Sequence, residues 1–204
     1  EMLRHRMLSR NVASSRAIPF EKMVKDVEED PFIPIAWQKH HSGMQGDEYL
    51  STEYDYSGYH AIHCWLEAKN QAVRLANDMN RLGVTKQLCN RLLEPFVWTT
   101  ELVSGTEWEN FFELRCPKYH YDLEDKYFRS KKDWLEYYKK NCIGDVNSDF
   151  TLKEEDWFNI NKSQAEIHIQ KIAEMMWDEI NLSVPKVLKS GEYHLPFIEI
   201  EEDI

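Results

Sequence analysis

The residues best suited to chemistry lie close to the beginning of the chain. The stretch from Arg4 to Arg16 contains four arginines, one histidine, three serines and one asparagine, and it has no acidic residue. The chain as a whole has 36 Asp and Glu against 25 Lys and Arg, with a formal net charge of -11. Guanidinium groups bind planar oxyanions through paired hydrogen bonds, and Ser and Asn add neutral donors. The stretch therefore indicates a phosphate site, a solvated basic arm, or a basic arm that docks on the protein's own acidic surface.

The order of these residues is more specific than their charge. It resembles the signature RHRxxSxNExSxR of the flavin-dependent thymidylate synthases (ThyX). The positions that match in register are Arg4, His5, Arg6, Ser9, Asn11, Ser14 and Arg16. One position departs, because Val12 stands where the family has Glu. The resemblance implies a helix-rich α+β fold that forms a homotetramer with active sites at the subunit interfaces.

Two later stretches resemble further motifs of the family. Residues 110–115 match its NFxxLR element, which implies that Asn110 contacts flavin and that Arg115 contacts the uracil ring. An arginine at a helix end, beside the negative pole of the helix dipole, is the structural alternative for Arg115. Residues 83–93 resemble G-x-P-x-E-x-A-R-x-x-L, with Gln87 at the Glu position and Asn90 at the Arg position. We therefore expect Arg91, one position later, to supply the cation.

The resemblance implies reductive methylation of dUMP to dTMP. Methylenetetrahydrofolate would supply the carbon, FAD would supply the hydride and NADPH would regenerate the flavin. Arg115 would be catalytic, because a cation at the uracil edge favours negative charge that develops on the ring. The residues implied to bind dUMP are Arg4, Ser14, Ser15, Arg16, Arg91 and Arg115. The residues implied to bind FAD are Arg4, His5, Arg6, Asn11, Ser104 and Asn110.

Other functions stay open from the sequence. Val12 and Gln87 replace two family carboxylates, so either neighbouring residues take their place or the reaction differs, with hydroxymethyl transfer to a pyrimidine nucleotide as the nearest variant. A non-catalytic nucleotide-binding protein would keep the arginines without the flavin. A structural or interaction protein would use the basic stretch to dock on an acidic partner.

Periodicity predicts the elements that position these residues. Helices are expected over 20–27, 62–82 with Gly83 as its end, 86–94, and 110–115 after a capping box at Thr106–Glu109. Further helices are expected to start near Ser130 and near Ser163. Pro31 and Pro34 predict an extended segment, and residues 96–104 are rich in β-formers. The expected core positions of two helices are Leu88, Leu92 and Leu93, and Ile169, Ile172, Ala173, Met176, Trp177 and Ile180.

We interpret residues 1–204 as one ThyX-like catalytic domain. Residues 117–162 have no counterpart in the compact pattern of the family, and we interpret them as an aromatic-rich insertion. For its role we favour packing or an oligomer contact over a lid. The SSRAIP stretch and the GEYHLPF ending, residues 191–197, resemble the bacteriophage branch of the family. Because the chain begins with Glu1 and shows no signal peptide, we expect the true start to lie upstream.

The bulk properties exclude several classes of protein. The sequence has no run of about 18 apolar residues, so no membrane span is expected. The excess of acidic over basic residues argues against general nucleic-acid binding. Four cysteines without a CxxC pair indicate reduced thiols and a cytoplasmic protein, in the host cytoplasm if phage-encoded. His60 and His63 have helical spacing but no third ligand at a clear spacing, so no metal is expected.

Overall fold

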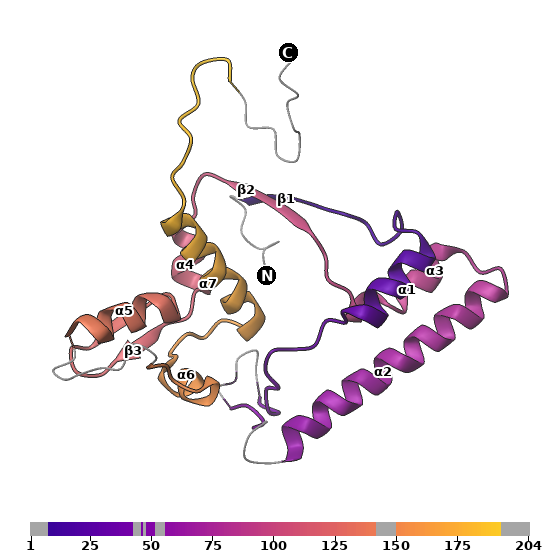
Figure 1. Cartoon of the computed structure of the whole chain (residues 1–204), viewed down its shortest axis with the longest axis horizontal. Helices are drawn as coiled ribbons and strands as arrows, with labels where there is room; N and C mark the ends of the chain where they lie inside the picture. Colours follow the sequence, from indigo (N-terminus) through magenta and orange to yellow (C-terminus); the bar gives the residue numbers. More distant parts are fainter. Residues whose placement is uncertain (1–7, 43–45, 47, 52–55, 142–149, 193–204) are drawn as a thin grey trace.

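The chain forms two groups of helices joined by an antiparallel ribbon (Figure 1). The computed structural model describes residues 8–42, 46, 48–51, 56–141 and 150–192. Helices α1, α2 and α3 make up the first lobe, and α4, α5, α6 and α7 belong to the second. The described sheets are two small antiparallel pairs, β1–β2 and β3–β4. The α+β class expected from the sequence is therefore confirmed.

The first lobe is built around the long helix α2, Tyr56–Arg81. Helix α1, Phe20–Glu29, packs against it with Met23 and Val27 fully buried, as its apolar spacing predicts. Helix α2 begins six residues earlier than expected. Its last residue is Arg81, and the predicted terminating glycine follows two residues later: Gly83 has a φ of 84°, in the left-handed region that favours glycine.

Helix α3, Lys86–Arg91, corrects two predictions. It is shorter than expected, and a 3-10 turn (η2, Glu94–Phe96) follows it, because Pro95 disfavours α geometry in the residue before it. Leu93 is buried as predicted, but Leu88 and Leu92 are 53% and 38% exposed. The side of α3 that faces α1 and α2 instead buries Cys89 and Asn90.

The two lobes are connected by strands β1, Leu8–Val12, and β2, Glu101–Gly105. In this ribbon Ser9 lies opposite Ser104, Asn11 opposite Leu102, and Val12 opposite Glu101. Strand β2 covers only the last part of the β-prone stretch 96–104. The stretch begins with Phe96, which is buried in the core of the first lobe and does not join the strand. The basic stretch that the sequence singled out thus includes an edge of this ribbon.

The second lobe has two cores. Helix α4, Glu109–Arg115, packs against α7, Ile167–Leu182, through Phe111, Phe112 and Ala173. The other core joins strands β3, Tyr119–Tyr121, and β4, Lys126–Phe128, to helices α5, Lys131–Asn141, and α6, Glu154–Ile160. Its buried residues are Tyr119, Tyr121, Trp134 and Trp157. Aromatic residues of 117–162 therefore pack within the chain, which is one of the two roles favoured from the sequence.

Three details of this lobe differ from expectation. The predicted capping box is wrong, because Trp108 precedes α4 and makes no side-chain cap. Helix α7 begins at Ile167 rather than near Ser163. Glu166 caps this start, because its carboxylate accepts the N–H groups of His168 and Ile169. Ile172 and Ile180 are exposed, whereas Gln170 and Glu174 are buried, because this side of α7 faces polar groups of residues 131–161.

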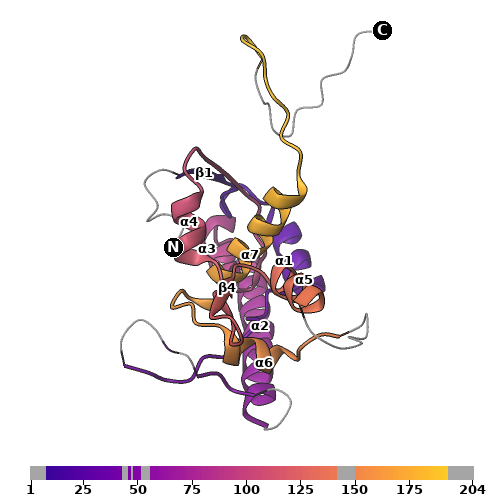
Figure 2. The same cartoon turned by 90° about the vertical axis from the view of Figure 1, so that its left-hand side faces the viewer.

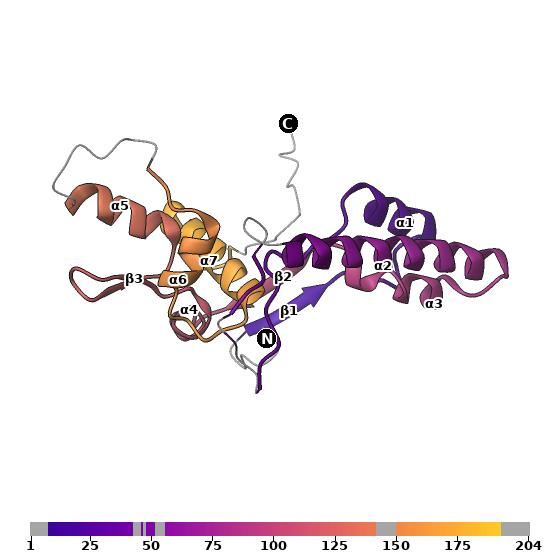
Figure 3. The same ribbon diagram turned by 90° about the horizontal axis from the view of Figure 1, so that it is seen from below.

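A second connection runs from residues 31–51 to α6 and α7. The backbone N–H of Ile35 donates to Nε2 of His168 at 3.2 Å, and Tyr49 stacks on Phe158 with ring centroids 4.8 Å apart. Seen from below, the lobes lie on either side of the ribbon (Figure 3), and they overlap in the view from the left-hand side (Figure 2). Within the described ranges, none of the helices is both long enough and apolar enough to cross a membrane.

Candidate functional site

The predicted flavin residues fall partly on the ribbon. Arg4, His5 and Arg6 lie outside the described residues. Asn11 and Ser104 are exposed on β1 and β2. Since paired residues point to the same side of a sheet and side chains alternate, Asn11 and Ser104 share one face of the ribbon, together with Ser9 and Leu102. The structure therefore brings these two predicted residues together.

The turn that contains Ser14 and Arg16 is held in place by α3. The N–H of Ala17 donates to the carbonyl of Ser14 at 2.9 Å, which closes the turn. The side-chain amide of Asn90 donates to the carbonyls of Ser15 at 2.8 Å and Ile18 at 3.1 Å. Asn90 is fully buried, so its role here is to anchor the turn rather than to contact a substrate.

Arg91 follows Asn90 and is exposed, as is Arg16 on the turn. Both predicted phosphate-binding cations are therefore exposed, one on the turn and one at the end of the helix that holds the turn. The hydroxyl of Ser15 donates to the carboxylate of Glu94 at 2.5 Å. A phosphate bound by Ser15 would have to replace this carboxylate as the acceptor.

A carboxylate also lies beside Val12. Glu101 is the cross-strand partner of Val12, and its Oε1 is 3.2 Å from Nη1 of Arg10. The position at which the family signature has Glu thus faces a Glu supplied by the opposite strand.

Asn110 and Arg115 lie on α4, which follows β2 at the other end of the ribbon from α3 and the Ser14–Ala17 turn (Figures 1 and 3). Asn110 is exposed and Arg115 is half-buried. Five paired residues per strand make this ribbon about 13 Å long. One chain therefore does not bring Arg115 together with Arg16 and Arg91.

An ion network fixes α4 in the second lobe. The Arg129 guanidinium donates to Glu109 at 2.5 Å and to Glu113 at 3.1 Å, and it lies over the ring of Trp177. The hydrogen bond from Arg129 lowers the pKa of Glu109. The hydrogen bond from Lys118, followed by that from Arg129, lowers the pKa of Glu113. These contacts orient the helix that carries Asn110 and Arg115.

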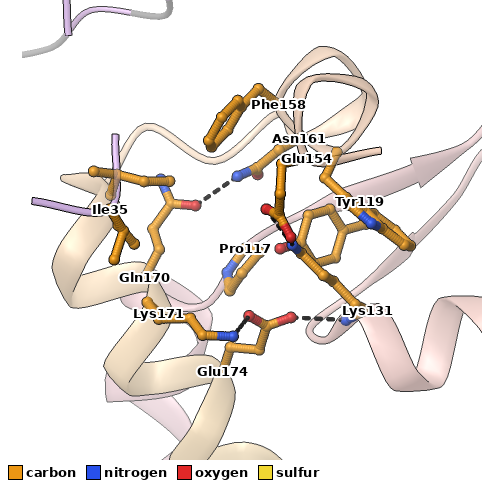
Figure 4. Close-up of a pocket in the computed structure, with 12 residues that line it drawn as sticks. Ile35, Pro117, Tyr119, Lys131, Glu154, Phe158, Asn161, Gln170, Lys171 and Glu174 are labelled. Carbon is orange, nitrogen blue, oxygen red and sulfur yellow. Dashed lines mark hydrogen bonds and ion pairs between the residues drawn. The ribbon is translucent and has the colours of Figure 1, made fainter. Parts of the chain in front are cut away.

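A cavity of about 330 Å³ that was not expected from the sequence lies between α6, α7 and the start of β3 (Figure 4). Its polar groups include Lys131, Lys171 and the buried carboxylate of Glu174. Burial, followed by the negative charge of Glu174, raises the pKa of the Tyr119 hydroxyl, so this group stays protonated. Glu174 and Gln170 interrupt an otherwise apolar spacing on α7, which is the signal in the sequence that could have indicated the site.

Two of the three described cysteines are buried, and the described residues form no metal cluster. Burial raises the pKa of the Cys116 thiol to about 12, which keeps it protonated. Cys89 is buried and Cys64 is exposed, and both are free thiols. Residues 8–42, 46, 48–51, 56–141 and 150–192 contain no group of three or more His, Cys, Asp or Glu side chains placed to hold a metal ion.

Comparison of the chain with models of protein families, with curated proteins and with solved structures gave no match.

Proposed function

We propose that the protein is an FAD-dependent thymidylate synthase of the ThyX type, which methylates dUMP to dTMP with methylenetetrahydrofolate and NADPH. The observation that carries the proposal is the in-register match of seven signature positions between Arg4 and Arg16. The NFxxLR match at Asn110–Arg115 supports it independently, because it lies about 100 residues further along the chain.

Bound FAD would supply the hydride in this reaction. Asn11 and Ser104 on one face of the ribbon, with Arg4, His5, Arg6 and Asn110, would hold the flavin. The exposed Arg16 and Arg91, with Ser14 and Ser15, would hold the dianionic phosphate of dUMP through charge-assisted hydrogen bonds. Arg115 would stabilise negative charge on the uracil ring.

A homotetramer with shared sites is part of the proposal. Arg115 and the Arg16–Arg91 surface lie at opposite ends of the ribbon, so a complete site needs a second copy to place its Arg115 beside the first copy's arginines. Exposed apolar side chains offer surface for such contacts: Ile172, Met175 and Ile180 on α7, Leu88 on α3, and Leu92 directly after α3. A cytoplasmic location, in the host cell if the protein is phage-encoded, belongs to the same proposal.

The deciding experiment uses the purified full chain. Flavin absorbance in the purified protein, or after incubation with FAD, together with conversion of dUMP to dTMP, is the expected result. A colourless protein that does not take up FAD would reject the enzyme and favour nucleotide binding without catalysis or a protein-interaction role for the basic stretch.

Hydroxymethyl transfer to a pyrimidine nucleotide is the second candidate, since Val12 and Gln87 replace family carboxylates. The pairing of Val12 with Glu101 favours plain methylation, because it returns a carboxylate to the neighbourhood of the signature. Mass analysis of the product formed from dUMP and labelled folate separates the two reactions by the extra oxygen of a hydroxymethyl product.

A further inference from the structure

The first half of helix α2 has an exposed surface without charged side chains. Residues 56–66 contain no Asp, Glu, Lys or Arg, although these four types make up 30% of the chain. Helices α1 and α3 lie along the second half of α2 (Figure 1). Tyr56 is 78% exposed and Tyr59 is 61% exposed. The centre of a protein–protein interface is typically poor in charge and rich in tyrosine, and this surface has that composition.

Two side chains that commonly bind metals lie next to each other on this surface. His60 and Cys64 are four residues apart, which places them on one face of the helix. Nε2 of His60 is 3.7 Å from Sγ of Cys64, and both residues are exposed. The ring of Tyr56 stacks on the ring of His60, with centroids 5.9 Å apart, and this contact restricts the orientation of the imidazole. The pair is therefore accessible and already oriented.

The separation of the two atoms matches that of ligands on one zinc-class ion. Tetrahedral zinc lies about 2.3 Å from a thiolate sulfur and about 2.0–2.1 Å from an imidazole nitrogen. At the tetrahedral angle these bond lengths place the nitrogen and the sulfur about 3.6 Å apart. Without a metal, a distance of 3.7 Å also suits a weak hydrogen bond from the thiol to the imidazole. An ion can therefore replace the thiol proton without rearrangement of the helix.

One chain supplies only half of a tetrahedral site. Within the described ranges, no third His, Cys, Asp or Glu is placed to complete the group. Structural zinc sites use four protein ligands, and two Cys with two His is a common set. Two copies related by a twofold axis present the same surface to each other, so each copy adds one His60 and one Cys64. The two thiolates neutralise a divalent ion, which suits a contact without charged residues.

We propose that His60 and Cys64 of two copies of the chain together bind one zinc-class ion, which bridges their α2 helices. Tyr56 and Tyr59 surround the ion in this contact. Each thiol releases its proton to solvent when the sulfur binds the metal, so two protons leave for every ion bound. None of these residues belongs to the proposed flavin or dUMP sites, so the metal site is independent of the proposed function.

Titration with Co²⁺ tests the site, because cobalt binds the same types of ligand and its spectrum reports them. The full chain is used without a histidine tag and with Cys142→Ser, which removes the cysteine outside the described residues. Difference spectra against the metal-free protein remove any flavin absorbance. We expect the visible bands of tetrahedral cobalt and a thiolate charge-transfer band, both saturating at one cobalt per two chains and displaced by Zn²⁺. Absence of these bands, or saturation at one cobalt per chain, overturns the proposal.

Matched variants assign the ion to the α2 pair. His60→Ala and Cys64→Ala each remove one ligand per copy and should weaken cobalt binding about tenfold or more. Cys64→Ala should also abolish the charge-transfer band. His63→Ala is the control, because His63 is exposed on the same helix but lies outside the pair, and it should bind cobalt like the parent protein. Unchanged binding in His60→Ala, or an equal loss in His63→Ala, contradicts the assignment. Circular dichroism without metal confirms that each variant is folded.

Discussion

The side-chain amide of Asn90 donates a hydrogen bond of 2.8 Å to the carbonyl oxygen of Ser15. The same amide donates to the carbonyl of Ile18 at 3.1 Å, so one buried side chain spans the turn that carries Ser14 and Arg16. Because Arg91 is the next residue on α3, this contact fixes the turn relative to that arginine. The spacing of the two proposed phosphate-binding arginines therefore depends on Asn90.

Replacement of Asn90 by Ala should destabilise the protein. The two carbonyls lose their donor, and we expect the free energy of unfolding to fall by about 1–3 kcal/mol. Urea unfolding followed by tryptophan fluorescence measures the change. Gln87→Ala, at an exposed position of the same helix, is the control and should change stability by less than about 0.5 kcal/mol. Equal effects of the two substitutions would argue against an anchoring role for Asn90.

The sequence predicted elements whose signals are local. The apolar spacing of α1 and the glycine that ends α2 involve neighbouring residues, and both predictions are confirmed. The α3 face was assigned wrongly because Asn90 is polar and Leu88 is apolar. Asn90 is buried because its partners lie more than 70 residues away, and no local pattern contains that information.

The same limit applies to the candidate site. The resemblance to the family implied Asn11 and Ser104 as flavin-binding residues, but the strand register that places them on one face is a long-range property. The contact of Ser15 with Glu94 is equally non-local. The cavity beside Glu174 is formed by several segments that lie far apart in the sequence. The periodicity of α7 predicted only apolar residues on its buried side, but Gln170 and Glu174 are buried there with hydrogen-bond partners from residues 131–161.

The ion network around α4 predicts a dependence of stability on pH. The pKa values of Glu109 and Glu113 lie below the ordinary value of 4.5, so their ion pairs contribute fully above pH 4.5 and are lost as the pH falls below it. In Arg129→Met both carboxylates lose a partner. The free energy of unfolding should then be lower at neutral pH, and it should fall less steeply below pH 4.5 than in the wild type.

Denaturant unfolding at a series of pH values measures these slopes. Arg81→Met is a matched control, because Arg81 pairs with Asp78 on the exposed side of α2, at 3.3 Å. This control should keep the wild-type slope below pH 4.5. An Arg129→Met slope equal to that of the wild type would show that the network does not link α4 stability to pH.

The thiols should differ in their reactivity. Cys64 is exposed on α2, whereas burial raises the pKa of Cys116 to about 12, and Cys89 is fully buried. In a Cys142→Ser background, which removes the cysteine outside the described residues, we expect a thiol reagent to label one cysteine rapidly. The other two should react only after denaturation. Cys64→Ser should abolish the rapid phase, and rapid labelling of Cys116 would disprove its assigned burial.

A carboxylate at position 12 should be unfavourable in this protein. Val12→Glu places two acidic side chains directly opposite each other, because Glu101 is the cross-strand partner. Like charges at such a pair destabilise a ribbon, and we expect a loss of about 0.2–1 kcal/mol relative to the isosteric Val12→Gln. The difference, measured by thermal unfolding, should shrink at high salt. A more stable Val12→Glu would contradict the idea that Glu101 already occupies this role.

Arg115 provides the sharpest test of the proposed reaction. The guanidinium at the end of α4 would stabilise charge on the uracil ring, and removal of one such donor costs roughly 3 kcal/mol, or a factor of about 10² in turnover. In Arg115→Ala we therefore expect dTMP formation to fall by about this factor or more while flavin absorbance is retained. Arg74→Ala, on the exposed side of α2, is the control and should keep full turnover. A fully active Arg115→Ala protein would remove Arg115 from the catalytic site, and loss of flavin together with activity would assign it to cofactor binding instead.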